Sequence, residues 1–188
     1  LELLAVEAQR LGVAAVADSG SKAGSGIKVQ SAGQGSVTTA ITGNTIRQYN
    51  NFGIELETGG GATAQSGVFN ANVTGNTVGN PGTGGLPMNG IHLNGGTVPA
   101  DTYAICTNIG GAGPLANSVT GSGANGGTDI RVRQRQSTTV NLPGYAGANN
   151  DNTAVQTFLS GRNGGASLLA SNTVPTGGGF TGTGTGCP

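Results

Sequence analysis

Two short segments return along this chain in the same order, and this repetition limits the folds that the chain can adopt. The first segment begins with Gly-Ile or Asp-Ile at positions 26, 53, 90 and 129, so that successive copies start 27, 37 and 39 residues apart. The second segment is rich in threonine and asparagine and spans 37–46 and 69–78, with a weaker copy that starts at 105, is interrupted at 110–116 and resumes at 117. Such spacing predicts a repeated structural unit with loops inserted into its later copies.

Apolar and polar residues alternate within each segment, as they do in a strand with one buried face. We expect Ile27 and Val29 to point inward, and Lys28 and Gln30 to point outward. Two or three such strands per turn, bent at Gly-Asn, describe a parallel β-solenoid. The rival architecture is a β-sandwich. Its antiparallel hairpins would favour two-residue turns directly between strands and would not require the same strand pair to return with the same corner.

The corner Gly43-Asn-Thr-Ile46 and the strands Gly53-Ile-Glu-Leu56 and Gly90-Ile-His-Leu93 resemble the repeats of large exported bacterial surface proteins. The resemblance covers roughly residues 17–188. It implies an all-β fold, a right-handed parallel β-helix with a short C-terminal capping helix, and it implies that the chain is the C-terminal part of such a protein. It leaves function open, because this architecture carries lyases, hydrolases, adhesins and phage tailspikes alike.

The composition supports an ordered chain of short strands and argues against several partners. Glycine accounts for 38 of 188 residues, but charged residues make up only 9% and Val, Ile and Thr recur throughout, unlike a disordered chain. The formal net charge is zero, so we expect no nucleic-acid partner. No apolar run approaches the roughly 20 residues of a membrane-spanning helix.

The chain has two cysteines, Cys106 and Cys187, which form neither a CxxC redox pair nor a zinc-binding pattern. We predict that they form one structural disulfide in a secreted or cell-surface protein. The alternative is two unrelated thiols.

We expect three regions along the chain. Residues 1–16 form an N-terminal cap or a severed first coil, 17–148 form the coils, and 149–188 form a capping helix followed by a Gly/Thr-rich tail. The first region could be an amphipathic helix or a strand. It also superficially resembles a type IV pilin anchor, although Glu7, Gln9 and Arg10 interrupt the apolar run that such an anchor needs.

The C-terminal helix has recognisable ends. Asp151 or Asn152 can cap its N-terminus and Gly161 can end it. Val155, Phe158 and Leu159 would then form one apolar face, with which the helix is expected to lie over the last coil. Residues 149–152 also offer oxygen ligands for calcium, but they lack the acidic spacing of an EF-hand, and helix capping explains them better.

Stacked coils would place the outward residues in columns about 4.8 Å apart. One column holds Lys28, Glu55, His92 and Arg131, and the next holds Gln30, Glu57, Asn94 and Arg133. From these strands we select a candidate anion- or glycan-binding set: Arg131, Arg133, Arg135, Lys28 and His92. The alternative is a solvated face on which opposite charges pair along the ladder.

We predict no catalytic residue and no cofactor. Glu55 and Glu57 are two outward carboxylates without an aspartate cluster, which is a poor set for glycosidic cleavage. His92 is the only histidine, so we expect it on the surface rather than in a metal site. A series at the corners of the repeat is predicted to be an internal, structural ladder: Asn44, Asn76 and Asn117.

The functional expectation is a non-enzymatic structural or adhesive module of a secreted or cell-surface β-helix protein, one that forms fibres or associates with itself. Its expected partners are itself, further coils of the parent protein, or surface glycans. The alternative is a carbohydrate-active β-helix enzyme, either a polysaccharide lyase or a glycoside hydrolase, or the glycan-binding remnant of one.

Overall fold

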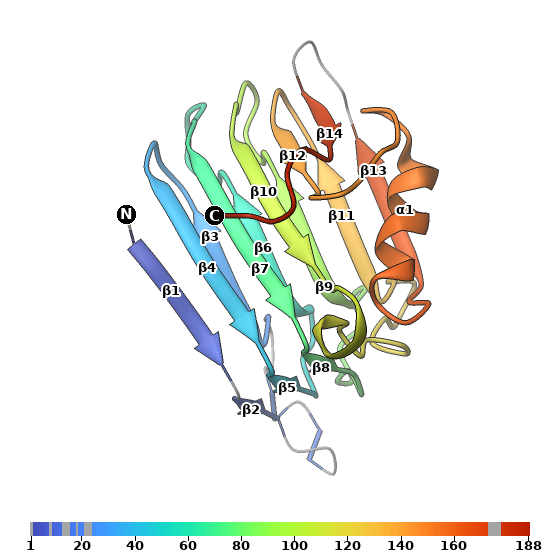
Figure 1. Ribbon diagram of the computed structural model, residues 1–188. Coiled ribbons are helices and arrows are strands. Elements are labelled where there is room, and N and C mark those ends of the chain that lie inside the picture. Colours follow the sequence, from blue (N-terminus) through green and yellow to red (C-terminus); the bar gives the residue numbers. More distant parts are fainter. Residues whose placement is uncertain (1, 8, 13–15, 18, 21–23, 173–177) are drawn as a thin grey trace.

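A computed structural model describes residues 2–7, 9–12, 16–17, 19–20, 24–172 and 178–188. Within them the chain winds into a parallel β-solenoid with one α-helix near the C-terminus (Figure 1). All pairings between its named strands are parallel, which confirms the solenoid and excludes the sandwich. No helix in the described ranges is long and apolar enough to cross a membrane.

The strands among the described residues form three sheets. A six-stranded sheet contains, in spatial order, β1 (Glu2–Glu7), β4 (Ser36–Thr42), β7 (Val68–Thr74), β10 (Ala104–Ile109), β12 (Thr139–Asn141) and β14 (Gly179–Thr181). A five-stranded sheet contains β13 (Leu168–Asn172), β11 (Ile130–Gln134), β9 (Asn89–Gly95), β6 (Phe52–Thr58) and β3 (Ile27–Ser31). A short third sheet contains β2 (Arg10–Leu11), β5 (Thr45–Ile46) and β8 (Thr77–Val78).

The N-terminal segment is extended. Strand β1 pairs with β4, and β2 pairs with β5, so the segment supplies two sides of a coil. The described residues of this region therefore form strands, and the expectations of an amphipathic helix or a pilin-like helix are wrong. Residues 1, 8, 13–15 and 18 lie outside the described residues.

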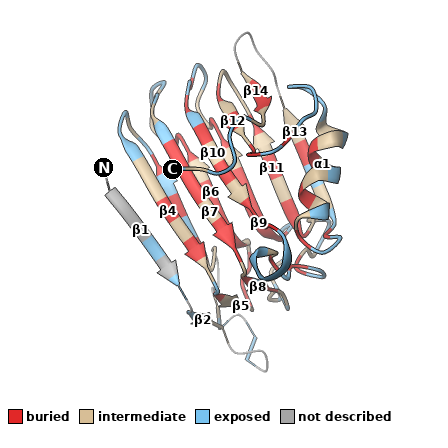
Figure 2. Ribbon diagram, in the orientation of Figure 1, coloured by how far each residue is buried: buried red, intermediate tan, exposed pale blue. Residues whose placement is uncertain are grey.

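The five-stranded sheet carries the expected isoleucine stack. Ile27, Ile54, Ile91 and Ile130 occupy one register position, and the last three are fully buried. Buried positions follow the inner faces of the strands throughout the solenoid (Figure 2). The glycine before each of the first three isoleucines has a steric reason; for example, a Cβ on Gly53 would meet the carbonyl oxygen of Gly90 at 2.6 Å. The recurring Gly-Ile pair thus lets successive coils approach closely and places an aliphatic side chain in the core.

A continuous row of asparagines runs through the corners of the coils. Asn44 donates to Asn76 Oδ1 through both its backbone nitrogen and Nδ2, each at 3.0 Å. Asn76 donates to Asn117 Oδ1 in the same two ways, also at 3.0 Å each. Asn117 donates to Asn163 Oδ1, with Nδ2 at 2.9 Å. At the other end, the backbone nitrogen of Gln9 donates to Asn44 Oδ1. The row therefore connects the first coil to the C-terminal helix.

The C-terminal helix α1 (Asn152–Gly161) begins where the sequence indicates, since the Asp151 side chain accepts a hydrogen bond from the backbone nitrogen of Ala154 at 2.9 Å. Val155 and Leu159 are buried, and the helix packs against the edge strand β13 (Figure 1). Just after the helix, Arg162 donates to the carbonyl oxygen of Gly110 at 2.8 Å, which ties this end of α1 to the segment that follows β10. Of residues 149–152, Asp151 therefore caps the helix.

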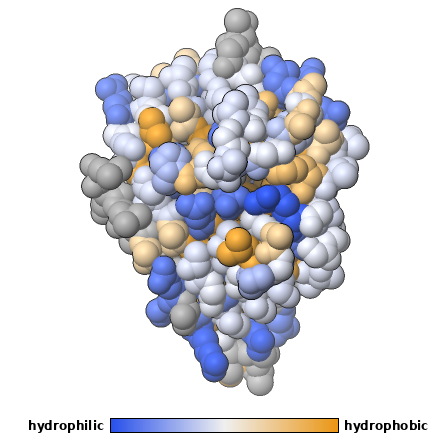
Figure 3. Space-filling model, viewed as in Figure 1, coloured by the Kyte–Doolittle hydropathy of each residue, from blue (hydrophilic) through white to orange (hydrophobic). Residues whose placement is uncertain are grey.

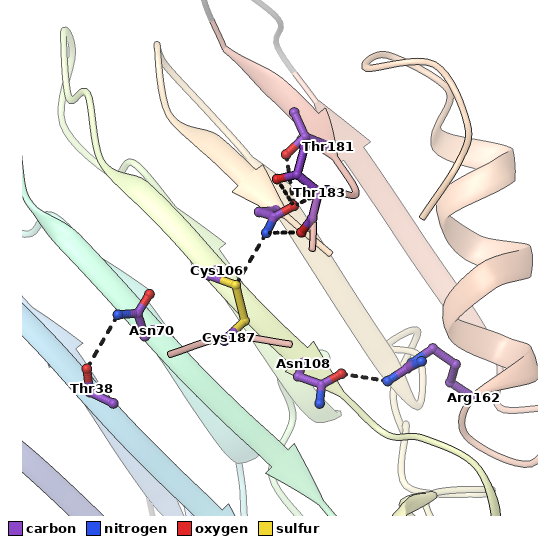
Figure 4. The surroundings of a disulfide bond; sticks show 9 residues. Thr38, Asn70, Cys106, Asn108, Arg162, Thr181, Thr183 and Cys187 are labelled. Carbon is purple, nitrogen blue, oxygen red and sulfur yellow. Dashed lines mark hydrogen bonds between the residues drawn. A yellow bond between two sulfur atoms is a disulfide. The ribbon is translucent and has the colours of Figure 1, made fainter. Parts of the chain in front are cut away.

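The predicted disulfide is present. Cys106 points outward from β10 and is bonded to Cys187 in the tail, 81 residues further along (Figure 4). Asn141 holds the same tail, because its Oδ1 accepts from the backbone nitrogen of Thr183 at 2.8 Å and its Nδ2 donates to the carbonyl oxygen of Thr183 at 3.0 Å.

On the face of the molecule shown in Figure 3, a hydrophilic band crosses the middle, with small hydrophobic patches above and below it.

Candidate anion-binding site

The outward side chains of the five-stranded sheet lie in the predicted columns. The register aligns Lys28, Glu55, His92, Arg131 and Leu169 in one column, and Gln30, Glu57, Asn94, Arg133 and Ser171 in the next. Arg135 follows one residue after β11, and its backbone nitrogen donates to the carbonyl oxygen of Gly95 at 2.9 Å. Four of the five candidate residues therefore lie on the neighbouring strands β9 and β11 or directly after β11. Lys28 lies apart from them, on β3.

Lys28 is committed to two carboxylates. Its Nζ lies 3.3 Å from Glu55 Oε1 and 2.5 Å from Glu57 Oε2. Burial alone would lower the pKa of Lys28, but its hydrogen bond to Glu57 and the charges of both glutamates outweigh this effect and raise it. Glu55 also accepts a hydrogen bond from Ser25 Oγ. Three strand separations, about 14 Å, lie between β3 and β11, so Lys28 belongs to this ion-paired cluster and not to the arginine site.

His92 is not the surface residue that its outward position suggested, since only 4% of it is exposed. Its ring lies 4.2 Å from the ring of Phe52, centroid to centroid, and both of its ring nitrogens are buried without a hydrogen-bond partner. Burial lowers the pKa of His92 to about 3, and the positive charges of Arg131, Arg133 and Lys28 add to the effect. His92 is therefore neutral at physiological pH, with one ring nitrogen that donates and one that accepts.

This buried histidine makes stability depend on pH. The pKa of His92 in the folded chain, about 3, is below the ordinary value of 6.5. On acidification, the unfolded chain therefore binds a proton at this residue that the folded chain does not bind. The contribution of His92 to the free energy of unfolding is fully present above pH 6.5 and is lost as the pH falls towards 3. We expect a loss of about 2–3 kcal/mol between pH 6.5 and 4.5. Urea unfolding across this range, compared between the natural chain and a His92→Gln variant, measures it.

The stability contribution of Asp129 has the same sign of pH dependence. Burial opposes its ionisation, but hydrogen bonds from Ser167, Gly123 and Ser122 outweigh burial and lower its pKa below the ordinary 3.8. The contribution of Asp129 to the free energy of unfolding is therefore lost only at pH values below the range from about 6.5 to about 4.5 that is used to test His92. If the His92→Gln variant loses stability between pH 6.5 and 4.5 as steeply as the natural chain, His92 is not the titrating group.

The three arginines on and after β11 have no balancing carboxylate in the described ranges, where Lys28 makes both ion pairs. Burial lowers the pKa of Arg133, and the like charges of Arg131 and Arg135 lower it further. Arg131 Nε is buried without a hydrogen-bond partner, as is Asn94 Oδ1 in the adjacent column. Strand β13, on the far side of β11, contains no charged residue. The arrangement concentrates positive charge along one strand and leaves polar groups unsatisfied beside it.

The site differs from the sequence expectation in three residues. Lys28 leaves the candidate set, whereas Asn94 and Phe52 join it as neighbours of His92. Asn94 could have been found from the column that contains Arg133. Phe52 precedes the Gly-Ile pair in one copy of the repeat, and nothing in the repeat marks it as a partner of His92. No group of three or more His, Cys, Asp or Glu side chains with the geometry of a metal site occurs among the described residues.

Comparisons of this chain with protein-family models, curated proteins and solved structures found no match. The fold and the side chains described above therefore carry the functional argument.

Proposed function

We propose that this chain is a non-catalytic structural and adhesive module of a secreted or cell-surface β-solenoid protein. The observation that carries the proposal is the Cys106–Cys187 disulfide, which anchors the C-terminal tail to β10. Disulfides persist in oxidising environments outside the cytosol, where a rigid scaffold with polar outward faces can serve attachment. The asparagine row, which connects the coils from Gln9 to Asn163, adds internal rigidity.

The charges on the outward columns support a structural role for Glu55 and Glu57. Glycosidic cleavage needs one carboxyl group that gives a proton and a second carboxylate that acts as base or nucleophile. Here both glutamates share the ammonium group of Lys28, and Ser25 donates to one of them. An ion-paired ladder of this kind stabilises neighbouring strands by about 0.2–1 kcal/mol per pair.

Turnover assays test the non-catalytic part of this proposal. The oxidised chain is incubated with acidic and neutral polysaccharides, and both new reducing ends and unsaturated products are measured. We expect neither product. Turnover that disappears in a Glu55→Gln variant would overturn the proposal and favour the enzyme alternative.

Light scattering and retention on immobilised polysaccharides test the adhesive part. We expect the chain either to be retained on a polysaccharide surface or to form particles larger than one chain. A strictly monomeric chain that no polysaccharide retains would contradict an adhesive role.

A further inference from the structure

We propose that Arg131 and Arg133, together with His92 and Asn94, bind an acidic sugar unit of a polysaccharide by its carboxylate and a neighbouring hydroxyl. This inference rests on the adhesive function proposed above and gives it a ligand class and a location. The ligand chain lies along β11.

The arginines supply recognition of the carboxylate. They occupy alternate outward positions of one strand, and residues two apart on a strand are separated by about 6.6 Å. Arg135 follows directly after the strand, so three arginines succeed one another along one line, which suits a polymer with repeated negative charges. Each guanidinium can form two parallel hydrogen bonds with one carboxylate, a geometry that an ammonium group cannot reproduce.

The neutral side chains beside the arginines indicate a hydroxyl in the same ligand. Asn94 Oδ1 is an acceptor without a partner, and neutral His92 has one donating and one accepting nitrogen without partners. Leaving such groups unsatisfied is energetically unfavourable, so a ligand that pairs with them gains affinity. A simple anion offers no proton to Asn94 Oδ1, whereas a sugar hydroxyl can both donate and accept. The unsatisfied groups therefore match a sugar that bears a carboxylate better than they match an inorganic anion.

Access to these atoms requires the arginine side chains to turn. The unpartnered atoms of His92 and Asn94 are covered by surrounding side chains, and Arg131 and Arg133 extend from the positions directly beside them. Arginine has many staggered rotamers and can move its guanidinium outward to a ligand. On binding, the guanidinium groups would face the carboxylates and the uncovered nitrogen and oxygen atoms would face the hydroxyls.

Charge on the sheet fixes the direction of the ligand. Across the sheet, beyond His92 and Asn94, the cluster of Lys28, Glu55 and Glu57 has a formal charge of minus one. A polyanion that crossed the sheet would meet these glutamates, whereas one that follows β11 meets only arginines. Nucleic acid is a poorer candidate, because its binding rests on many phosphate contacts and the whole chain has a formal net charge of zero.

The test is calorimetric titration of the oxidised chain with oligomers of galacturonic acid at low salt. The comparison ligands are the same oligomers with their carboxylates reduced to alcohols, a fully sulfated dextran oligomer that has no free hydroxyl, and single-stranded DNA of matched charge. We expect binding to the uronate oligomer, no detectable binding to the reduced oligomer, and weaker binding to sulfated dextran and DNA. Equal affinity for all three polyanions, or tighter binding to DNA, would overturn the assignment to an acidic sugar.

Four variants locate the site. Arg133→Ala should lose about tenfold to a hundredfold in affinity, because a charged hydrogen-bonded group is removed. Arg133→Lys should recover only part of this loss, because it keeps the charge but not the guanidinium fork. Asn94→Leu tests the hydroxyl contact and should weaken uronate binding without weakening binding to sulfated dextran. Arg10→Ala removes one exposed positive charge on β2 and should change affinity less than about twofold.

The thermal midpoint of each variant shows whether it is folded. Removing Arg133 relieves its repulsion from Arg131 and Arg135, so the midpoint should not fall markedly. Uronate binding that is unchanged in a folded Arg131→Ala, Arg133→Ala double variant would overturn this site while leaving the adhesive function standing. Cleavage of the oligomer during the titration would instead overturn the proposed function itself.

Discussion

Replacing both Cys106 and Cys187 with serine should lower the free energy of unfolding by about 4 kcal/mol. The disulfide joins residues that are 81 positions apart, and in the chain-entropy description a cross-link of this length removes much of the freedom of the unfolded chain. Serine at position 106 keeps an acceptor for Asn141 Nδ2, which donates to Cys106 Sγ, so the cost should come mainly from the lost cross-link.

Urea unfolding of the oxidised chain and of the double-serine variant measures this difference. The natural chain unfolded in excess reductant is the matched control and should agree with the variant. A difference below about 1 kcal/mol would show that β14 and Asn141 hold the tail without help from the disulfide.

Replacing Asn76 with alanine should destabilise the chain by about 3–5 kcal/mol, because it leaves several buried backbone groups unpaired. Asn76 Oδ1 accepts from both the backbone nitrogen and Nδ2 of Asn44, and Asn76 Nδ2 donates to the carbonyl oxygens of Ile41 and Thr74. Asn76 itself is fully buried, so water cannot replace these bonds without a cavity.

The matched control for this change is Asn72→Ala, four residues earlier and on the half-buried outward face of β7. We expect the control to change stability by less than about 0.5 kcal/mol. Thermal and urea unfolding of the two variants should therefore differ clearly. Equal and small effects would mean that the corner asparagines do not hold the coils together.

Much of the fold was predictable because the repeat fixes register. Gly-Ile returning before Gly-Asn places Ile27, Ile54 and Ile91 in one inward position, and the structure agrees. The asparagine row was predicted only as far as Asn117. Its last member, Asn163, follows helix α1, where the repeat has been replaced by a helix, so no spacing in the sequence connects Asn163 to the earlier corners.

The site was less predictable because alternation assigns a side chain to a face but does not determine its exposure. His92 points outward, yet the column neighbours on adjacent strands and the ring of Phe52 leave it buried. For the same reason, the sequence could place Lys28 and Arg131 in one column but could not show that Lys28 is held by Glu55 and Glu57. Side-chain pairing across strands depends on rotamers, which the repeat does not specify.

We propose that this solenoid holds an acidic polysaccharide without cleaving it. Sedimentation velocity of a fluorescently labelled uronate polymer, mixed with the oxidised chain and then returned to high salt, tests this claim most directly. We predict that the polymer sediments faster with the chain at low salt and recovers its original sedimentation coefficient at high salt, because the contacts are electrostatic. A polymer that sediments more slowly after the salt step has been cut, and a polymer that never sediments faster has not been bound; either result would contradict the account.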